Sequence, residues 1–133
     1  MADSLQFDLV SPEQKVASSE AKSVQIPGML GDFTAMPQHS PFLSTIRPGI
    51  VKVTTESETF EYVVTGGFAE VTASATSILA EQAVPREDFD TAMLESLAAD
   101  AEYGLNEATD DESRILASQR VRDVAYLKSQ LGI

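Results

Sequence analysis

Short stretches of alternating apolar and polar residues fill the first two thirds of the chain. Leu5, Phe7 and Leu9 alternate with polar residues, and period-two segments of the same kind recur between turn signals. They lie at residues 15–18, 23–26, 49–54, 59–64, 68–73 and 77–80. So many short strands with close-set turns predict an antiparallel β-sandwich or a flattened barrel.

The pattern takes on a helical period after Pro85. Apolar residues recur at four-residue spacing, at Phe89, Met93, Leu97 and Ala101. Three acids precede or accompany them where the helix dipole favours negative charge, namely Glu87, Asp88 and Asp90. We expect these acids in the first turn of a helix that ends at Gly104, followed by a linker over residues 105–108.

A second helix is predicted after this linker. Thr109 and Glu112 have the spacing of a capping box, which would satisfy the free N–H groups of the first turn. An apolar stripe follows at Leu116, Val124, Leu127 and Leu131. The sequence therefore predicts an α+β chain, with a β-sandwich domain at residues 1–85 and an antiparallel α-helical hairpin domain at residues 86–133.

Residues 26–48 are rich in proline and glycine, which interrupt helices and strands. They hold four of the six prolines, two of the seven glycines and the only histidine, His39. We expect a long shaped loop that joins strands and offers a contact surface.

Composition narrows the classes of function. The chain has 133 residues, 43% of them hydrophobic, and it lacks cysteine, which excludes disulfides and thiolate metal sites. Its formal charge of −12 disfavours nucleic acid and anionic lipid and favours a protein partner with basic patches. No apolar run reaches the roughly 18 residues of a membrane span, and we expect no targeting presequence.

Catalytic chemistry has little support in the residue pattern. His39 is the single imidazole, and a catalytic triad could be drawn on paper from His39, Asp32 and either Ser40 or Ser44. Only nearness in sequence supports this triad, so we favour a loop role for His39 and keep a small hydrolase as an alternative. Phosphate-binding glycine loops and EF-hand loops are absent. We therefore expect a binding or structural module with no catalytic residues, no metal and no cofactor.

Several motifs together resemble a known family. They are Gly31-Asp32, the segment MPQHSPFL at residues 36–43, Arg47-Pro48-Gly49, the segment TGGFAEV at residues 65–71 and the segment LAEQA at residues 79–83. In these segments the chain resembles the epsilon subunit of rotary F-type ATP synthases, which is called delta in mitochondria. The resemblance is strong over residues 5–83 and weak over the helices.

The resemblance implies a non-catalytic central-stalk subunit of the rotor, which couples proton flow to ATP synthesis. By motif position, Gly31 and Asp32 would contact the membrane c ring, and His39, Pro41 and Phe42 would lie toward the gamma subunit. Asp32→Arg would then weaken coupling or assembly. The implied location is peripheral, on the cytoplasmic face of the bacterial inner membrane, without direct insertion into it.

The chain departs from the family pattern in the helices. Some relatives bind ATP through a hydrophobic-Asp-x-x-Arg-Ala motif, of which only Asp90 remains here, since Met93 and Leu94 replace Arg and Ala. We therefore expect no specific ATP site. Relatives that inhibit ATP hydrolysis insert a basic final helix into the alpha/beta catalytic head, whereas residues 86–133 hold 5 bases and 11 acids, a net charge of −6. A weak regulatory role of the hairpin is left open.

A second reading comes from a different class of protein. The chain could be a free-standing β-sandwich protein-binding module with a helical oligomerisation tail. It would then form a stable homo-oligomer without affinity for a gamma subunit.

Overall fold

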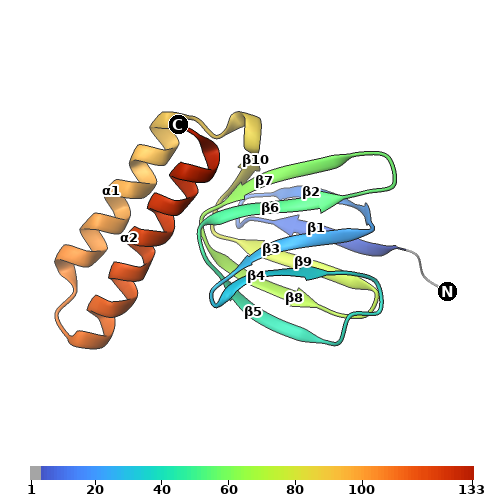
Figure 1. Ribbon diagram of the computed structural model, residues 1–133, viewed down its shortest axis with the longest axis horizontal. Coiled ribbons are helices and arrows are strands. Elements are labelled where there is room, and N and C mark those ends of the chain that lie inside the picture. Colours follow the sequence, from blue (N-terminus) through green and yellow to red (C-terminus); the bar gives the residue numbers. More distant parts are fainter. Residues whose placement is uncertain (1–3) are drawn as a thin grey trace. The chain divides into compact units, whose positions relative to one another are not determined.

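The computed structural model describes residues 4–133, and its first part is a β domain (Figure 1). Its strands are β1 (Leu5–Val10), β2 (Lys15–Ala21), β3 (Ser23–Gly28), β4 (Gly31–Ala35), β5 (Phe42–Ile46), β6 (Gly49–Thr54), β7 (Thr59–Val64), β8 (Gly67–Val71), β9 (Ala75–Ala80) and β10 (Ala83–Pro85). The predicted strands are all present, two of them with the predicted bounds and most others longer by one to three residues, whereas β4, β5 and β10 had no predicted counterpart.

The strands of the described chain form one strongly curved sheet. Its order is β10-β7-β6-β3-β5-β8-β9-β1-β2, with β4 paired to β3. All neighbours are antiparallel except β1 and β9, which run parallel. The predicted fold class, a mainly antiparallel β-sandwich or flattened barrel followed by two helices, is confirmed.

Alternating residues of the strands build the core of the β domain. On β1, Leu5, Phe7 and Leu9 are buried, and the Phe7 ring packs against that of Tyr62 with a centroid distance of 6.3 Å. Opposing strands add further buried aliphatic side chains, including Val51, Val53, Ile46 and Ile78. Each fully buried side chain of this size stabilises the fold by about 1.5–3 kcal/mol, so period-two patterning is enough to specify which face of each strand points inward.

The stretch at residues 26–48 is not the long loop that its prolines and glycines suggest. It contains the end of β3 and all of β4 and β5, joined by a tight turn at residues 29–30 and a loop at residues 36–41. Pro27 has no N–H to donate to a neighbouring strand, and its carbonyl oxygen accepts a hydrogen bond from the Arg47 amide. The prediction of one extended loop was wrong because the prolines and glycines mark turns between very short strands.

The last part of the chain is a helical hairpin. A short 3₁₀ turn, η1 (Arg86–Asp88), precedes α1 (Thr91–Glu107) and α2 (Asp111–Leu131). The chain divides into two compact units, the first ending at Arg86 and the second comprising Glu87–Ile133. Within the second unit, α1 and α2 pack along each other as an antiparallel pair (Figure 1).

The boundaries of the first helix differ from the prediction. Gly104 does not stop α1, which continues through the expected linker to Glu107, because the backbone at Gly104 stays helical and Ala108 caps the helix. Glu87 and Asp88 belong to η1 and not to the first helical turn.

The cap of the second helix is also shifted. Its capping box is formed by Asp110 and Ser113, one residue beyond the predicted pair Thr109 and Glu112. The Ser113 amide donates to the Asp110 carboxylate at 2.7 Å, and this bond lowers the pKa of Asp110. Aspartate is as good a cap as threonine, so the sequence permits both positions.

The apolar stripes of the two helices are narrower than predicted. On α1, Leu94, Leu97 and Ala101 are buried while Met93 is 41% exposed. On α2, Val124 and Leu127 are buried, but Leu116 is 63% exposed. The hairpin therefore has a small core.

Candidate functional site

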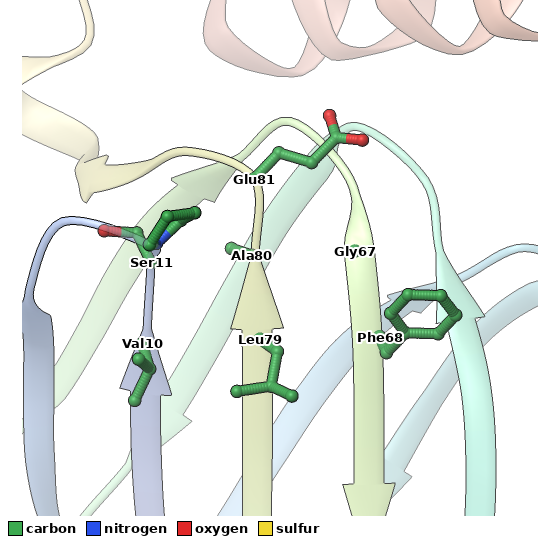
Figure 2. A pocket seen from close by; sticks show the side chains of 8 residues that line it. Val10, Ser11, Gly67, Phe68, Leu79, Ala80 and Glu81 are labelled. Atoms are coloured by element: carbon green, nitrogen blue, oxygen red, sulfur yellow. The ribbon is translucent and has the colours of Figure 1, made fainter.

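The outer face of the β domain carries an apolar row across neighbouring strands. The registers place Val10 of β1 beside Leu79 of β9, Leu79 beside Phe68 of β8, and Phe68 beside Thr45 of β5. Figure 2 shows the side chains of Val10, Leu79 and Phe68 in line on adjacent strands. Leu79 and Phe68 are 57% and 55% exposed, and Leu43, two residues from Thr45 on β5, is 69% exposed.

A shallow hollow accompanies this row. It has a volume of about 330 Å³ and is lined by Val10, Ser11, Pro12, Gly67, Phe68, Leu79, Ala80 and Glu81 (Figure 2). Apolar side chains dominate the lining, and the hollow is wide open to solvent. We define the apolar face as Val10, Leu43, Phe68 and Leu79; such a surface suits a protein partner better than a small molecule.

The sequence contains a signal for this face that strand alternation alone does not explain. Leu9 and Val10, Phe68 and Ala69, and Ile78 and Leu79 are pairs of consecutive apolar residues in strands that otherwise alternate. In each pair one residue is buried and the other points outward. An apolar residue out of phase with the core thus marks a second, exposed apolar surface.

The turn between β3 and β4 projects from one end of the β domain. It consists of Met29 and Leu30, and the Leu30 side chain is fully exposed at 104%. Gly31 follows with φ of 141°, a conformation that favours glycine. The predicted site residues Gly31 and Asp32 are thus the first two residues of β4, directly after an apolar tip.

Asp32 is engaged within the chain. Its carboxylate oxygen lies 2.5 Å from a terminal nitrogen of Arg47, and the other terminal nitrogen donates to the Gly28 carbonyl at 2.6 Å. The Asp32 side chain is 41% exposed and that of Arg47 only 12%. Arg47 therefore joins the base of the β3–β4 turn to the end of β5.

His39 lies at the opposite end of β4. It sits in the loop at residues 36–41, where the Gln38 amide donates to the Ala73 carbonyl and the His39 amide donates to the Met36 carbonyl. Of the other predicted contact residues, Pro41 is exposed and Phe42 is 48% exposed, with its ring edge-on to that of Phe33 at 5.2 Å. Asp32 and His39 therefore belong to two separate surfaces.

The triad drawn from sequence is not assembled. The His39 Nδ1 donates to the Ser40 carbonyl at 2.6 Å, since a carbonyl oxygen can only accept. The Ser44 hydroxyl donates to the Thr45 carbonyl at 2.9 Å, and the Asp32 carboxylate is bound to Arg47. Each group has a partner other than the one that nucleophilic catalysis requires.

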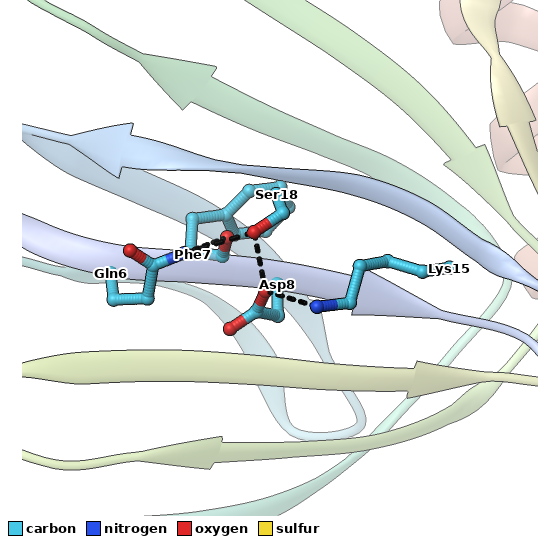
Figure 3. A network of polar contacts seen from close by, with 5 residues as sticks. All are labelled: Gln6, Phe7, Asp8, Lys15 and Ser18. Atoms are coloured by element: carbon cyan, nitrogen blue, oxygen red, sulfur yellow. Dashed lines mark hydrogen bonds and ion pairs between the residues drawn. The ribbon is translucent and has the colours of Figure 1, made fainter.

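A polar network lies on the first two strands (Figure 3), and its Asp8 is two residues before Val10 of the apolar face on β1. The Ser18 hydroxyl donates to the Asp8 carboxylate at 2.7 Å, Gln6 donates to the Ser18 hydroxyl at 3.0 Å, and Lys15 lies 3.4 Å from Asp8. The Ser18 hydrogen bond and the Lys15 charge lower the pKa of Asp8, against the opposing effect of burial. The network ties the edge strand β2 to β1.

A second, smaller hollow lies between the helices. It has a volume of about 180 Å³ and is lined mainly by alanine and aliphatic side chains together with Glu102 and Lys128.

Asp90, the remnant of the nucleotide motif, caps α1 by accepting a hydrogen bond from the Met93 amide at 2.8 Å. Its carboxylate therefore has a structural role at the helix terminus.

Residues 4–133 contain no group of three or more histidine and acidic side chains that could hold a metal ion. In the same residues, no helix is long and apolar enough to cross a membrane.

The family model of the beta-sandwich domain of the ATP synthase delta/epsilon chain matches residues 4–86. The chain belongs to this family. The predicted family is thereby confirmed, and so is the prediction that the chain is not an enzyme, because the epsilon chain of ATP synthase is a structural, non-catalytic subunit. The hydrolase reading of His39 was wrong, whereas the free-standing module stays an alternative prediction.

Relatives of the epsilon family match nearly the whole chain. The ATP synthase epsilon chain of Ruegeria sp. (strain TM1040) is 52% identical over 113 residues, covering 85% of this chain and 82% of the relative. That of Fuscovulum blasticum is 45% identical over 132 residues, covering 99% of both. A chain in the Euglena gracilis mitochondrial ATP synthase shares the fold, with a TM-score of 0.74 at 22% identity, over 98% of this chain and 83% of that one.

Proposed function

We propose that this epsilon-family chain is a central-stalk subunit of the rotor of a proton-translocating ATP synthase. Its β domain binds the gamma subunit and the c ring, and so couples proton flow to ATP synthesis. The family assignment supports the complex, and the two separate surfaces of the β domain support two partners. The chain acts peripherally, on the cytoplasmic face of a bacterial inner membrane.

The single observation that supports gamma binding is the apolar face. Three large side chains, Leu43, Phe68 and Leu79, are each more than half exposed on one outer surface, and leaving them in water is unfavourable. His39 and Pro41 lie in the loop that leads into β5, and Phe42 is the first residue of that strand, next to Leu43 in the chain but with its ring on the other side of the strand, against Phe33. We assign both groups to the gamma contact.

The opposite end of β4 is assigned to the c ring. Gly31 and Asp32 follow the exposed β3–β4 turn there.

The helical hairpin has its own compact core and can contribute weakly to regulation, through the alpha/beta catalytic head. No nucleotide is assigned to it, because Asp90 is used as a helix cap.

Paired substitutions test the gamma contact. Phe68→Asp places a charge in the middle of the apolar face, whereas Phe60→Asp changes the same residue type on β7, where Phe60 is 38% exposed. We expect Phe68→Asp to weaken binding to purified gamma at least about tenfold and Phe60→Asp to change it by less than about twofold. Equal effects of the two substitutions would contradict the assignment.

A further inference from the structure

Hydrogen bonds join the β3–β4 turn to the end of β5, and most of them are made by Arg47. The Arg47 side chain bonds the Gly28 carbonyl and the Asp32 carboxylate, and its amide donates to the Pro27 carbonyl at 2.9 Å. Two residues before it, the Thr45 carbonyl accepts from the Met29 amide at 2.9 Å. These bonds span both sides of the turn whose tip is Leu30.

The charges at this point are balanced inside the chain. Arg47 is only 12% exposed, so its guanidinium depends on the Asp32 carboxylate and the Gly28 carbonyl for the interactions that water would otherwise supply. The negative charge of the Asp32 carboxylate is in turn paired with the Arg47 guanidinium. A basic group of a partner would have to compete with a guanidinium that is already in place.

The residue that projects furthest is uncharged. Leu30 is fully exposed and Met29 is 42% exposed, whereas both charged groups lie behind them at the base of the turn. A two-residue turn without side-chain contacts of its own would be mobile, and ordering it on binding would cost free energy. Fixing the base of the turn removes much of this cost before the partner arrives.

We propose that Asp32 and Arg47 form an internal clamp that positions the β3–β4 turn, and that Leu30, not the Asp32 charge, makes the contact with the c ring. The proposal rests on the proposed function for the identity of the partner. It replaces the expectation that Asp32 meets basic residues of the ring. Arg47, which the sequence showed only as part of Arg47-Pro48-Gly49, becomes a positioning residue.

Two substitutions separate the clamp from a direct ion pair. Asp32→Asn removes the charge but keeps an acceptor for Arg47, whereas Arg47→Ala removes the clamp and leaves the Asp32 charge free. The clamp predicts that binding of the full chain to a purified gamma–c-ring subcomplex weakens about tenfold or more for Arg47→Ala and clearly less for Asp32→Asn, which keeps the Gly28 bond and a neutral acceptor. A direct ion pair predicts the reverse order, and that result would overturn the proposal.

Two further variants test the contact and the geometry. Leu30→Asp should weaken binding about tenfold or more without changing the thermal stability of the free chain, because the side chain is fully exposed. Arg47→Lys keeps the charge but has one nitrogen in place of the two terminal nitrogens that bond Gly28 and Asp32 separately, so its binding should fall between that of Arg47→Ala and the unsubstituted chain. Unchanged binding of Leu30→Asp would overturn the contact role.

Hydrogen exchange of the free chain measures the clamp without any partner. In Arg47→Ala, the amides of Met29 and residue 47 should lose protection relative to the unsubstituted chain, while those of the β6–β7 pair keep theirs. Unchanged protection at both amides would overturn the clamp. If the unsubstituted chain does not bind the subcomplex, the proposed function and the Leu30 contact both fail, and the exchange result still decides on the clamp.

Discussion

A β-carbon at position 67 would lie 2.0 Å from the carbonyl oxygen of Leu79 on the neighbouring strand. Gly67 also has φ of 138°, a conformation that residues with a side chain rarely adopt. The Gly66-Gly67 pair thus brings β8 and β9 together directly beneath the apolar face, where Phe68 and Leu79 are register neighbours. In this way a local backbone requirement sets the spacing of two exposed contact residues.

Gly67→Ala is expected to destabilise the β domain by about 2–4 kcal/mol, because the strand backbone must move to make room. Gly104→Ala is the matched control: apart from its chain neighbours and the backbone of its own helix, nothing lies within 4 Å of the added carbon, and the site is helical. The control should be neutral or stabilise by up to about 1 kcal/mol. Urea unfolding followed by circular dichroism measures both, and a cost at Gly67 no larger than that at Gly104 would contradict the packing argument.

The Asp8 network predicts a specific pH dependence of stability. Because hydrogen bonding to Ser18 and the charge of Lys15 lower the folded-state pKa of Asp8 below its ordinary value of 3.8, the carboxylate stabilises the fold above that pH. This contribution is lost as the pH falls through the lower folded-state value. Asp8→Asn should therefore cost about 0.5–1 kcal/mol at pH 7 and much less at pH 2.

Denaturant unfolding at the two pH values measures this difference. The exposed Asp100 of α1 supplies the control, since Asp100→Asn removes the same charge away from the network. A cost of Asp8→Asn that is equal at pH 7 and pH 2 would show that the charge of Asp8 does not contribute.

The small core of the hairpin predicts early opening. Its buried apolar side chains are Leu94, Leu97, Ala101, Val124 and Leu127, far fewer than those of the β domain. We expect the amides of residues 87–131 to exchange before those of the core strands in native-state hydrogen exchange. Exchange as slow as that of β1 and β9 would show that the hairpin has support that its own core does not provide.

The charge of the hairpin predicts a modest regulatory effect. Residues 86–133 carry a net charge of −6, which does not favour deep insertion into a partner that also binds anionic nucleotides. Deletion of residues 87–133 should therefore change ATP hydrolysis by the assembled complex less than about twofold. Strong activation of hydrolysis by the deletion would show that the hairpin is an inhibitor.

Much of the fold follows from local patterns in the sequence. The alternation of Leu5, Phe7 and Leu9 is enough to predict a half-buried strand, and the predicted and observed bounds agree at residues 49–54 and 59–64. The helices were predicted from the period of their apolar residues, but their ends were not. The end of α1 was missed because Gly104 is compatible with a helix, and the start of α2 was missed because the adjacent residues Thr109 and Asp110 are both good caps.

The parts that could not be predicted depend on contacts distant in sequence. Asp32 and Arg47 are 15 positions apart, and only the pairing of β3 with β4 and β5 brings them together. The apolar face likewise combines β1, β5, β8 and β9. Its single residues are visible in the sequence as apolar positions out of phase with the core, whereas their assembly into one row requires the strand order.

Affinity purification of the tagged chain from detergent-solubilised membranes of its native host tests the central claim most directly. We expect the gamma subunit and the c ring to co-purify with it, and we expect Phe68→Asp to reduce the recovery of gamma while Phe60→Asp does not. A stable homo-oligomer free of gamma and c subunits would contradict the account.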